Sequence, residues 1–129
     1  NVFYSGRASD NANLSDVARR HAGTKGADGT RFGNGDTLVQ ITKPQITSYA
    51  AARGVEQFGI MNSSTPLLGY RSTNVRGNKI AGISSSNRNI EIYMSEGESV
   101  INGKTLADMI AKGKKMTFEE YQTKKTYKK

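Results

Sequence analysis

The residues best suited to chemistry surround the single histidine of the chain. Arg19 and Arg20 come directly before His21, and Lys25 and Arg31 follow it. An imidazole can give or take a proton near neutral pH, and cationic side chains can stabilise charge that develops on phosphorus. This grouping favours phosphodiester cleavage, with His21 as acid or base and with Lys25 and Arg31 beside the reacting phosphate. The alternative is a helix end where the cations face the helix dipole and His21 packs.

A glycine-rich stretch and a second polar group could add phosphate contacts. Residues 23–36 contain five glycines, whose backbone N–H groups can approach a phosphate closely. Further along, Arg71 could stabilise the phosphorane, and Thr73 could orient a phosphate or a ribose 2′-OH. Metal-free ribonucleases need little more, because they only activate the 2′-OH and stabilise the transition state. For Arg71 and Thr73 the alternative is an ordinary polar turn.

A third set of residues keeps NAD-consuming chemistry open. Mono-ADP-ribosyltransferases order an arginine, a Ser-Thr-Ser strand and a Glu-x-Glu pair along the chain. This sequence is similar in having Arg7, then Ser72 with Thr73, and then Glu91 or the pair Glu96 and Glu98. It departs from the pattern in having asparagine after Thr73 and in placing the glutamate pair where we expect a turn. The bland alternative for that pair is a solvated acidic turn.

Composition excludes several classes of site. The chain has 129 residues, no cysteine and one histidine, so disulfide scaffolds, zinc–thiolate sites and two-histidine centres are ruled out. We find no His-x-His or Glu-x-x-His spacing and no phosphate-binding Gly-x-x-x-x-Gly-Lys motif, so we expect no metal and no cofactor. No apolar run is long enough to span a bilayer, and we expect no stable membrane insertion.

The charge balance points to a polyanionic partner. Nineteen Lys and Arg against eleven Asp and Glu give a net charge of +8, and most of the excess lies in the lysine-rich residues 112–129. Each neutralised phosphate releases counterions, so basic domains commonly bind nucleic acid. The alternative is a lysine tail that only maintains solubility. The residues that we expect to contact an RNA backbone are Arg19, Arg20, Arg76, Lys79, Lys124, Lys125, Lys128 and Lys129.

The elements that must position these groups begin with a helix. Asn13 or Ser15 can cap it, Leu14 starts its apolar stripe, and Gly23 ends it. We expect residues 23–36 to form an extended loop. Further helices are predicted over residues 45–53, 105–111 and 118–121, and short strands over residues 37–42, 57–61, 67–72, 79–84 and 89–94. The whole is predicted to be α+β, with an N-terminal helix or helices, a central antiparallel sheet and a short C-terminal helix.

The chain as a whole resembles the C-terminal toxin domains of contact-dependent growth inhibition (CdiA-type) and related polymorphic bacterial toxins. The shared features are an abrupt start, a length near one domain, a basic and cysteine-free composition rich in Gly, Ser and Asn, and a lysine-rich end. The opening Val2-Phe3-Tyr4-Ser5-Gly6-Arg7 is also similar to the start of some such domains. We therefore expect residues 1–129 to be a single toxin domain excised from a larger protein.

This resemblance implies a fold, partners and a place of action. Many such toxins are tRNA-cleaving ribonucleases with a barnase/EndoU/colicin/RelE-like architecture. Membership would imply a tightly bound, acidic immunity protein and, in some cases, elongation factor Tu as a helper. It would also imply delivery from a producing bacterium and action in the cytoplasm of the target cell.

The favoured interpretation is a metal-independent ribonuclease toxin that cleaves tRNA or other structured RNA. The 2′-OH attacks the adjacent phosphorus and leaves a 2′,3′-cyclic phosphate, with His21 as acid or base and Lys25, Arg31, Arg71 and Thr73 around the phosphate. Two alternatives stay open. One is an NAD-consuming toxin, an ADP-ribosyltransferase or NAD glycohydrolase. The other is a non-catalytic RNA-binding module, which needs only the basic surface.

Overall fold

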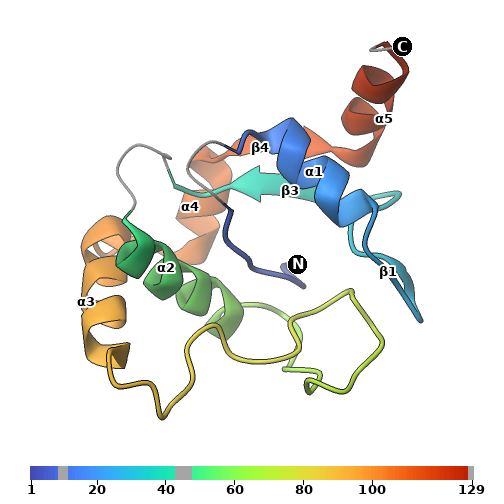
Figure 1. The fold of residues 1–129 in the computed structure, drawn as a ribbon. Coiled ribbons are helices and arrows are strands. Elements are labelled where there is room, and N and C mark those ends of the chain that lie inside the picture. The colour runs from blue at the N-terminus through green and yellow to red at the C-terminus, as the bar shows by residue number, and fades with distance from the viewer. Residues whose placement is uncertain (9–11, 43–47, 128–129) are drawn as a thin grey trace.

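Helices and two small antiparallel sheets alternate along the chain in an α+β arrangement (Figure 1). The structure is a computed structural model, and it describes residues 1–8, 12–42 and 48–127. The α+β class, with a helix before the sheets and a short helix at the C-terminal end, is confirmed. The elements are α1 (Leu14–Ala22), β1 (Lys25–Gly26), β2 (Gly29–Thr30), β3 (Thr37–Gln40), α2 (Tyr49–Met61), α3 (Ile90–Ile101), α4 (Leu106–Lys112), β4 (Lys114–Thr117) and α5 (Phe118–Tyr127).

Helix α1 forms as its sequence predicts. The Asn13 side chain accepts a hydrogen bond from the backbone N–H of Asp16, and the Asp16 carboxylate accepts one from the N–H of Asn13. This reciprocal capping box satisfies N–H groups that the first turn leaves without partners. The helix ends before Gly23, and its last turn holds the predicted basic residues. Its buried face carries Ala18 and His21, so the lone histidine points into the protein.

The first core cluster lies between α1 and the sheet of β3 and β4. The two strands pair antiparallel, from Thr37 opposite Thr117 to Gln40 opposite Lys114. Ala18 and Phe32 are buried here with Met116, and apolar side chains from α1, β3 and α5 pack around them. Strand β3 was predicted over residues 37–42, and it is confirmed for residues 37–40.

The second core joins α2 and α3 through a close approach of two glycines. A Cβ atom added at Gly54 would lie 2.9 Å from the Cα of Gly97, which no side chain tolerates. Val55, Ile101 and Met109 are buried beside this crossing. The pair of helices therefore depends on having no side chain at either glycine.

Four predicted strands are wrong. Residues 57–61 continue α2, and residues 90–94 begin α3, where the short alternating apolar run belongs to a longer helical pattern. Residues 67–72 and 79–84 form an irregular segment, in which the N–H groups of Leu68 and Gly69 donate to the carbonyls of Asn78 and Lys79. The predicted 23–36 loop contains a short hairpin, β1 with β2. The helix expected over residues 45–53 is present from Tyr49, and residues 45–47 lie outside the described residues.

The N-terminal segment runs between α1 and α2 and connects distant parts of the chain (Figure 1). The backbone N–H of Ser5 donates to Asn78 Oδ1 at 2.8 Å, and Asn78 Nδ2 donates to the carbonyl of Ser5 at 2.7 Å. Further back, Val2 accepts from the N–H of Ser64 at 2.7 Å. These contacts fix the segment that carries Tyr4 and Arg7. No helix in the described ranges combines the length and apolar character needed to cross a bilayer.

Candidate active site

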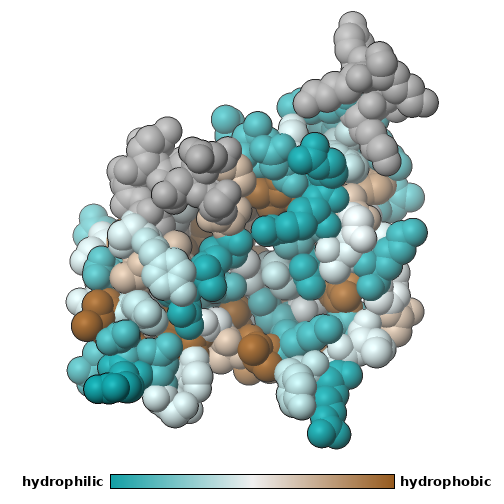
Figure 2. Space-filling view, in the orientation of Figure 1, coloured by the Kyte–Doolittle hydropathy of each residue, from teal (hydrophilic) through white to brown (hydrophobic). Residues whose placement is uncertain are grey.

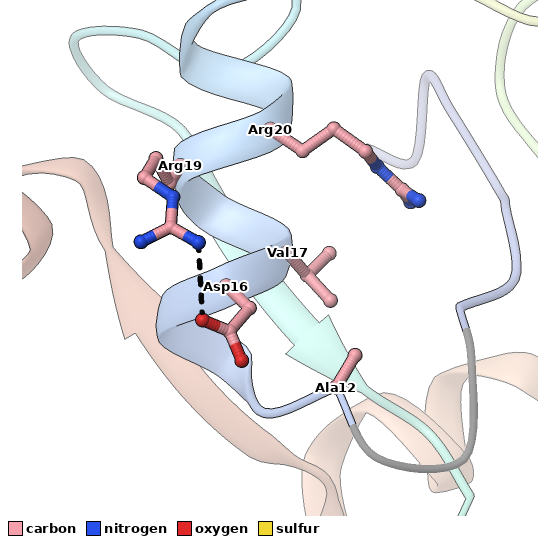
Figure 3. Close-up of a pocket in the computed structure, with 5 residues that line it drawn as sticks. All are labelled: Ala12, Asp16, Val17, Arg19 and Arg20. Carbon is pink, nitrogen blue, oxygen red and sulfur yellow. Dashed lines mark hydrogen bonds and ion pairs between the residues drawn. The ribbon is translucent and has the colours of Figure 1, made fainter.

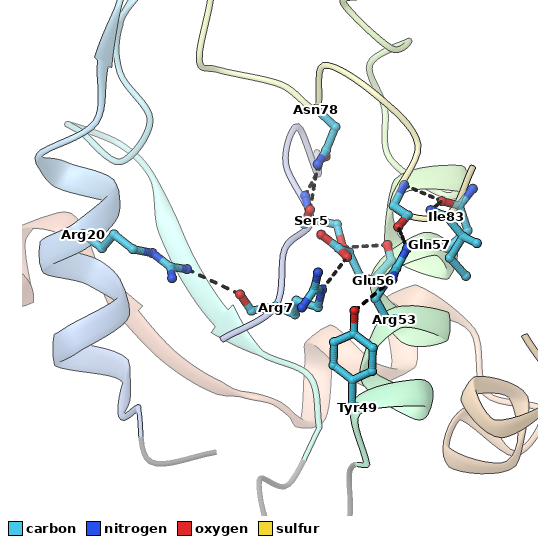
Figure 4. Close-up of polar contacts among 10 residues, drawn as sticks. Ser5, Arg7, Arg20, Tyr49, Arg53, Glu56, Gln57, Asn78 and Ile83 are labelled. Atoms are coloured by element: carbon cyan, nitrogen blue, oxygen red, sulfur yellow. Dashed lines mark hydrogen bonds and ion pairs between the residues drawn. The ribbon is translucent and has the colours of Figure 1, made fainter. Parts of the chain in front are cut away.

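The N-terminal segment brings an arginine to a half-buried carboxylate. Arg7 Nε lies 3.2 Å from Glu56 Oε1, and the two side chains are 42% and 16% exposed. A neighbouring hydrogen bond supports this pair, because Ser5 Oγ donates to the backbone carbonyl of Glu56 at 3.1 Å. Figure 4 shows Arg7 pointing from the N-terminal segment toward Glu56 on α2. The contact of Ser5 with the backbone of α2 thus keeps Arg7 close to Glu56.

Burial raises the proton affinity of the Glu56 carboxyl. Its pKa is raised above the ordinary value of 4.5 by desolvation, and the nearby charges of Arg7 and Arg53 only partly oppose this. A carboxyl with a raised pKa can take a proton from a substrate more readily than an ordinary surface glutamate. Glu56 therefore combines base strength with cations that can stabilise a developing anion.

A second arginine, Arg53 on α2, adds positive charge near Glu56. Arg53 Nη1 donates to Tyr49 Oη at 2.9 Å, and Arg53 Nη2 donates to the carbonyl of Gly82 at 3.0 Å. The guanidinium groups of Arg7 and Arg53 both lie over the Tyr49 ring, 5.2 and 5.7 Å from its centroid. In the described part of the structure Arg53 Nε is buried without a hydrogen-bond partner. We call Arg7, Glu56, Arg53 and Tyr49 the Arg7–Glu56 site.

The lone histidine lies between two guanidinium groups. His21 is 6% exposed, with Arg20 Nη2 3.4 Å from its Nε2 and Arg31 Nη1 3.3 Å from its Nδ1. The Tyr4 ring meets the imidazole edge-on, with centroids 5.3 Å apart. Burial, Arg20 and Arg31 together lower the pKa of His21 from 6.5 to about 4. The imidazole is therefore neutral at pH 7. We call His21, Arg20, Arg31 and Tyr4 the His21 cluster.

Arg20 connects the two groups of residues. Its Nη2 donates to the backbone carbonyl of Arg7 at 3.5 Å, and the same nitrogen lies beside His21. Figure 4 shows the Arg20 side chain reaching from α1 across to the N-terminal segment. Arg20 thus links the His21 cluster to the N-terminal segment that carries Arg7.

No family model, curated protein or solved structure matches this chain. The Arg7–Glu56 site and the His21 cluster are therefore the basis on which a function can be proposed.

Of the predicted catalytic residues, the structure brings His21 and Arg31 together. Arg31 Nε also donates to the carbonyl of Val75 at 3.1 Å, and its guanidinium lies 4.3 Å from the centroid of the Tyr4 ring. Arg31 is thus held in place from three sides. His21 is near the predicted cations, but its low pKa suits a neutral positioning group better than a protonated acid.

The other three predicted catalytic residues lie elsewhere. Lys25 is exposed in β1. Thr73 is also exposed, and its backbone carbonyl accepts from the N–H of Ala27 at 2.9 Å. Arg71 is exposed, with its guanidinium 5.9 Å from the centroid of the Tyr70 ring. Among the described contacts, none joins the side chains of these three residues to His21.

The predicted RNA-binding residues differ in how free their charges are. Arg76 forms a two-point ion pair with Asp36, at 2.7 and 2.9 Å, and its guanidinium lies 4.4 Å from the centroid of the Phe3 ring. Asp36 therefore already compensates the charge of Arg76, and this ion pair holds together the two loops that carry these residues. Arg19 is exposed and pairs with Asp16 at 3.3 Å, and Lys79 is half-buried.

The C-terminal lysines are only partly described. Lys124 is exposed on α5. Lys125 belongs to the same helix, but its side chain lies outside the described part, as do Lys128 and Lys129.

The glutamate expected for NAD chemistry is not the one that meets Arg7. Glu91, Glu96 and Glu98 all lie on α3, so the turn expected at Glu96 and Glu98 is helical instead. Glu96 Oε1 accepts from Ser48 Oγ at 3.1 Å, near the start of α2. Sequence reasoning missed Glu56. The sequence feature that could have indicated this residue is that Glu56 is the single acid among the mostly apolar residues 49–61.

A hollow of about 320 Å³ lies along α1 beside the His21 cluster. Figure 3 shows that Val17 and Arg20 point from α1 toward the N-terminal segment across this hollow. The remaining lining residues are Ala12, Asp16 and Arg19. Figure 2 shows hydrophilic side chains over much of this face of the molecule, with hydrophobic ones scattered between them. The described residues include no group of three or more His, Cys, Asp or Glu side chains arranged to hold a metal ion.

Proposed function

We propose that this chain is a metal-independent ribonuclease that cleaves tRNA or other structured RNA. The observation that carries the proposal is the Arg7–Glu56 pair, a half-buried carboxylate with a raised pKa held 3.2 Å from a guanidinium. A base beside fixed cations is what 2′-OH attack on phosphorus requires. The net charge of +8 supports a polyanionic substrate.

In the proposed reaction Glu56 takes the proton of the 2′-OH. The 2′-oxygen then bonds to phosphorus, the bond from phosphorus to the 5′-oxygen breaks, and that oxygen takes a proton from water. The products are a 2′,3′-cyclic phosphate and a 5′-hydroxyl. Arg7 lies 3.2 Å from Glu56 and supplies positive charge for the phosphorane. Glu56 replaces His21 as the proposed base, because the pKa of Glu56 is raised whereas that of His21 is lowered, and because Glu56 lies 3.2 Å from Arg7.

His21 has a positioning role in this proposal. A neutral imidazole lies between Arg20 and Arg31 and accepts a hydrogen bond from one of the two guanidinium groups, without adding a third positive charge. The lysines at the C-terminal end, of which Lys124 is described and exposed, would contact the RNA backbone away from the reacting bond.

The proposed biological setting rests on the resemblance to contact-dependent inhibition toxins. We propose that the chain is delivered into the cytoplasm of a target cell and that an acidic immunity protein neutralises it in the producer. Elongation factor Tu is the proposed helper if the purified chain needs cell extract for activity. The basic charge supports an acidic partner.

The test is incubation of the purified chain with total cellular RNA in EDTA, with and without cell extract. We expect discrete tRNA fragments that end in 2′,3′-cyclic phosphate. RNA that stays intact in both arms contradicts the proposal.

The Arg7–Glu56 pair also favours a second candidate, an NAD-consuming toxin. An arginine can bind the pyrophosphate of NAD, and a nearby glutamate can stabilise the positive charge that forms as the glycosidic bond breaks. The same incubation separates the candidates when NAD is added, because this function predicts intact RNA and disappearing NAD. A non-catalytic RNA-binding module predicts that both the RNA and the NAD stay intact.

A further inference from the structure

We propose that Arg20 and Arg31 form a phosphate-binding site at the nitrogen-bearing edge of the His21 ring. Arg20 Nη2 lies 3.4 Å from Nε2 and Arg31 Nη1 lies 3.3 Å from Nδ1 of one imidazole, so both cations lie against the edge of the ring that carries its nitrogens. The proposal deepens the proposed function, and rests on it only in taking the phosphate to belong to an RNA backbone next to the cleaved bond.

The imidazole cannot satisfy both arginines. A neutral histidine has one nitrogen that accepts a hydrogen bond and one N–H that donates, whereas a guanidinium only donates. One of the two contacts is therefore a hydrogen bond, and the other places two donors against each other. This arrangement leaves at least one guanidinium N–H at the edge of His21 without an acceptor there. An anion that accepts from both arginines would remove the conflict.

Among the described residues, no carboxylate compensates the charge of Arg20 or Arg31. The ion pairs of the described residues join Arg7 to Glu56, Arg19 to Asp16 and Arg76 to Asp36. None of these carboxylates pairs with Arg20 or Arg31. Two cations beside one ring, without a counterion among the described residues, mark a place where an anion gains from binding.

The site is preorganised and open on one side. Arg31 is held by the carbonyl of Val75 and by the face of the Tyr4 ring, so its guanidinium loses little freedom when a ligand binds. Arg20 is exposed and lines the hollow of about 320 Å³ along α1, which leaves room for a ligand at its guanidinium (Figure 3). The proposed ligand thus reaches Arg20 from the hollow, and Arg31 at the other nitrogen of the His21 ring is the second cation.

Anion binding at this site should be coupled to protonation of His21. The titratable and charged groups that face the imidazole are Arg20 from α1, Arg31 after β2, and Tyr4 from the N-terminal segment. A bound anion offsets the two positive charges, so it raises the pKa of His21, which is about 4 without it. By linkage, the anion then binds more tightly as the pH falls toward that pKa.

The test uses the lone histidine as an NMR probe, because its ring signals need no assignment among several histidines. The pKa of His21 is measured in the full chain with and without sodium sulfate, at one ionic strength balanced with sodium chloride. Sulfate stays dianionic over the whole range and mimics a phosphate group. We expect saturating sulfate to raise the pKa of His21 by about one unit. We expect Arg20→Gln to abolish this rise, since Arg20 is exposed and its loss leaves the core intact.

Arg88→Gln is the matched control, because Arg88 is exposed in the loop before α3. It should keep the sulfate-dependent rise. A pKa that is the same with and without sulfate overturns the site, as does an equal rise in the Arg20→Gln variant. If acid unfolds the chain before His21 titrates, the Nε–Hε signals of Arg20 and Arg31 at pH 6 give the same readout.

A second arm adds a dinucleotide that has no 2′-hydroxyl and resists the proposed cleavage. Shifts of the His21 signals with this phosphodiester support a backbone phosphate as the ligand, and shifts with sulfate alone support a terminal phosphate at the same site. No RNA is cleaved in either arm. A failed cleavage assay therefore overturns the proposed function and leaves this site standing.

Discussion

Arg7 and Glu56 are separated by 49 positions in the chain, yet their side chains meet at 3.2 Å. The contact exists because the N-terminal segment is fastened to Asn78 and to the backbone of α2. It turns an otherwise ordinary helical glutamate into a half-buried carboxyl with a cation beside it. The proposed chemistry depends on this one juxtaposition.

Removal of Arg7 should change the pH dependence of activity as well as its rate. Arg7 lowers the pKa of Glu56 against the larger opposite effect of burial, so Arg7→Gln should raise that pKa further. The acid limb of the kcat/KM profile should then move to higher pH, and the plateau should fall about 100-fold. The measurement is RNA cleavage from pH 4.5 to 8.5. Arg88→Gln should leave the acid limb in place, and an unmoved limb in Arg7→Gln would separate Arg7 from Glu56 in the mechanism.

Protonation of His21 should destabilise the fold. Its pKa in the folded chain is about 4, below the ordinary 6.5, so the stability that it contributes is present above pH 6.5 and is lost as the pH falls toward 4. The loss for this one group is about 3 kcal/mol. Urea unfolding of the wild type and of His21→Gln should therefore show a difference in stability that shrinks over this pH range. Parallel pH curves for the two proteins would contradict the assigned environment of His21.

The crossing of α2 and α3 should not tolerate a methyl group. Gly54→Ala would place a Cβ atom against the backbone of Gly97, so we expect about 2 kcal/mol of destabilisation. Gly23→Ala is the matched control, because a Cβ there would meet the carbonyls of Arg19 and Arg20 at the ordinary contact distances of 3.4 and 3.6 Å. Thermal unfolding of both variants makes the comparison. Equal melting temperatures would mean that the two helices are not packed through Gly54 and Gly97.

Sequence reasoning succeeded where structure is local. The cap of α1 by Asn13, its end before Gly23 and the basic last turn with His21 all follow from short-range rules, and all are present. The C-terminal helix α4 also lies within a residue of its predicted range, residues 105–111. The grouping of His21 with Arg31 was predictable because ten residues and one hairpin separate them.

Sequence reasoning failed where tertiary packing decides. Residues 89–94 alternate in hydrophobicity like a strand, but Ile92 is exposed and the segment is helical, because α3 packs on α2 through Gly97. Glu56 was not predicted as a site residue, because its environment depends on Arg7, which precedes α1 and is far from α2 in the sequence. Arg76 was predicted to bind RNA, and its pairing with Asp36 was likewise invisible in the sequence.

The C-terminal lysines should contribute salt-dependent binding without chemistry. Replacing Lys124, Lys125, Lys128 and Lys129 with glutamine should flatten the slope of log K against log salt by about 3, since each lost phosphate contact removes about 0.7 to 0.9. Filter binding of tRNA from 50 to 300 mM salt measures the slope. An unaltered slope would assign these lysines to solubility.

The most direct test of the account is the cleavage rate of Glu56→Gln. Glutamine keeps the size of the side chain and removes its ability to take a proton, so we expect at least a 100-fold loss of tRNA cleavage in EDTA with little change in tRNA binding. Glu119→Gln, at an exposed glutamate on α5, should cleave at the wild-type rate. Wild-type cleavage by Glu56→Gln would contradict the central claim that Glu56 is the base.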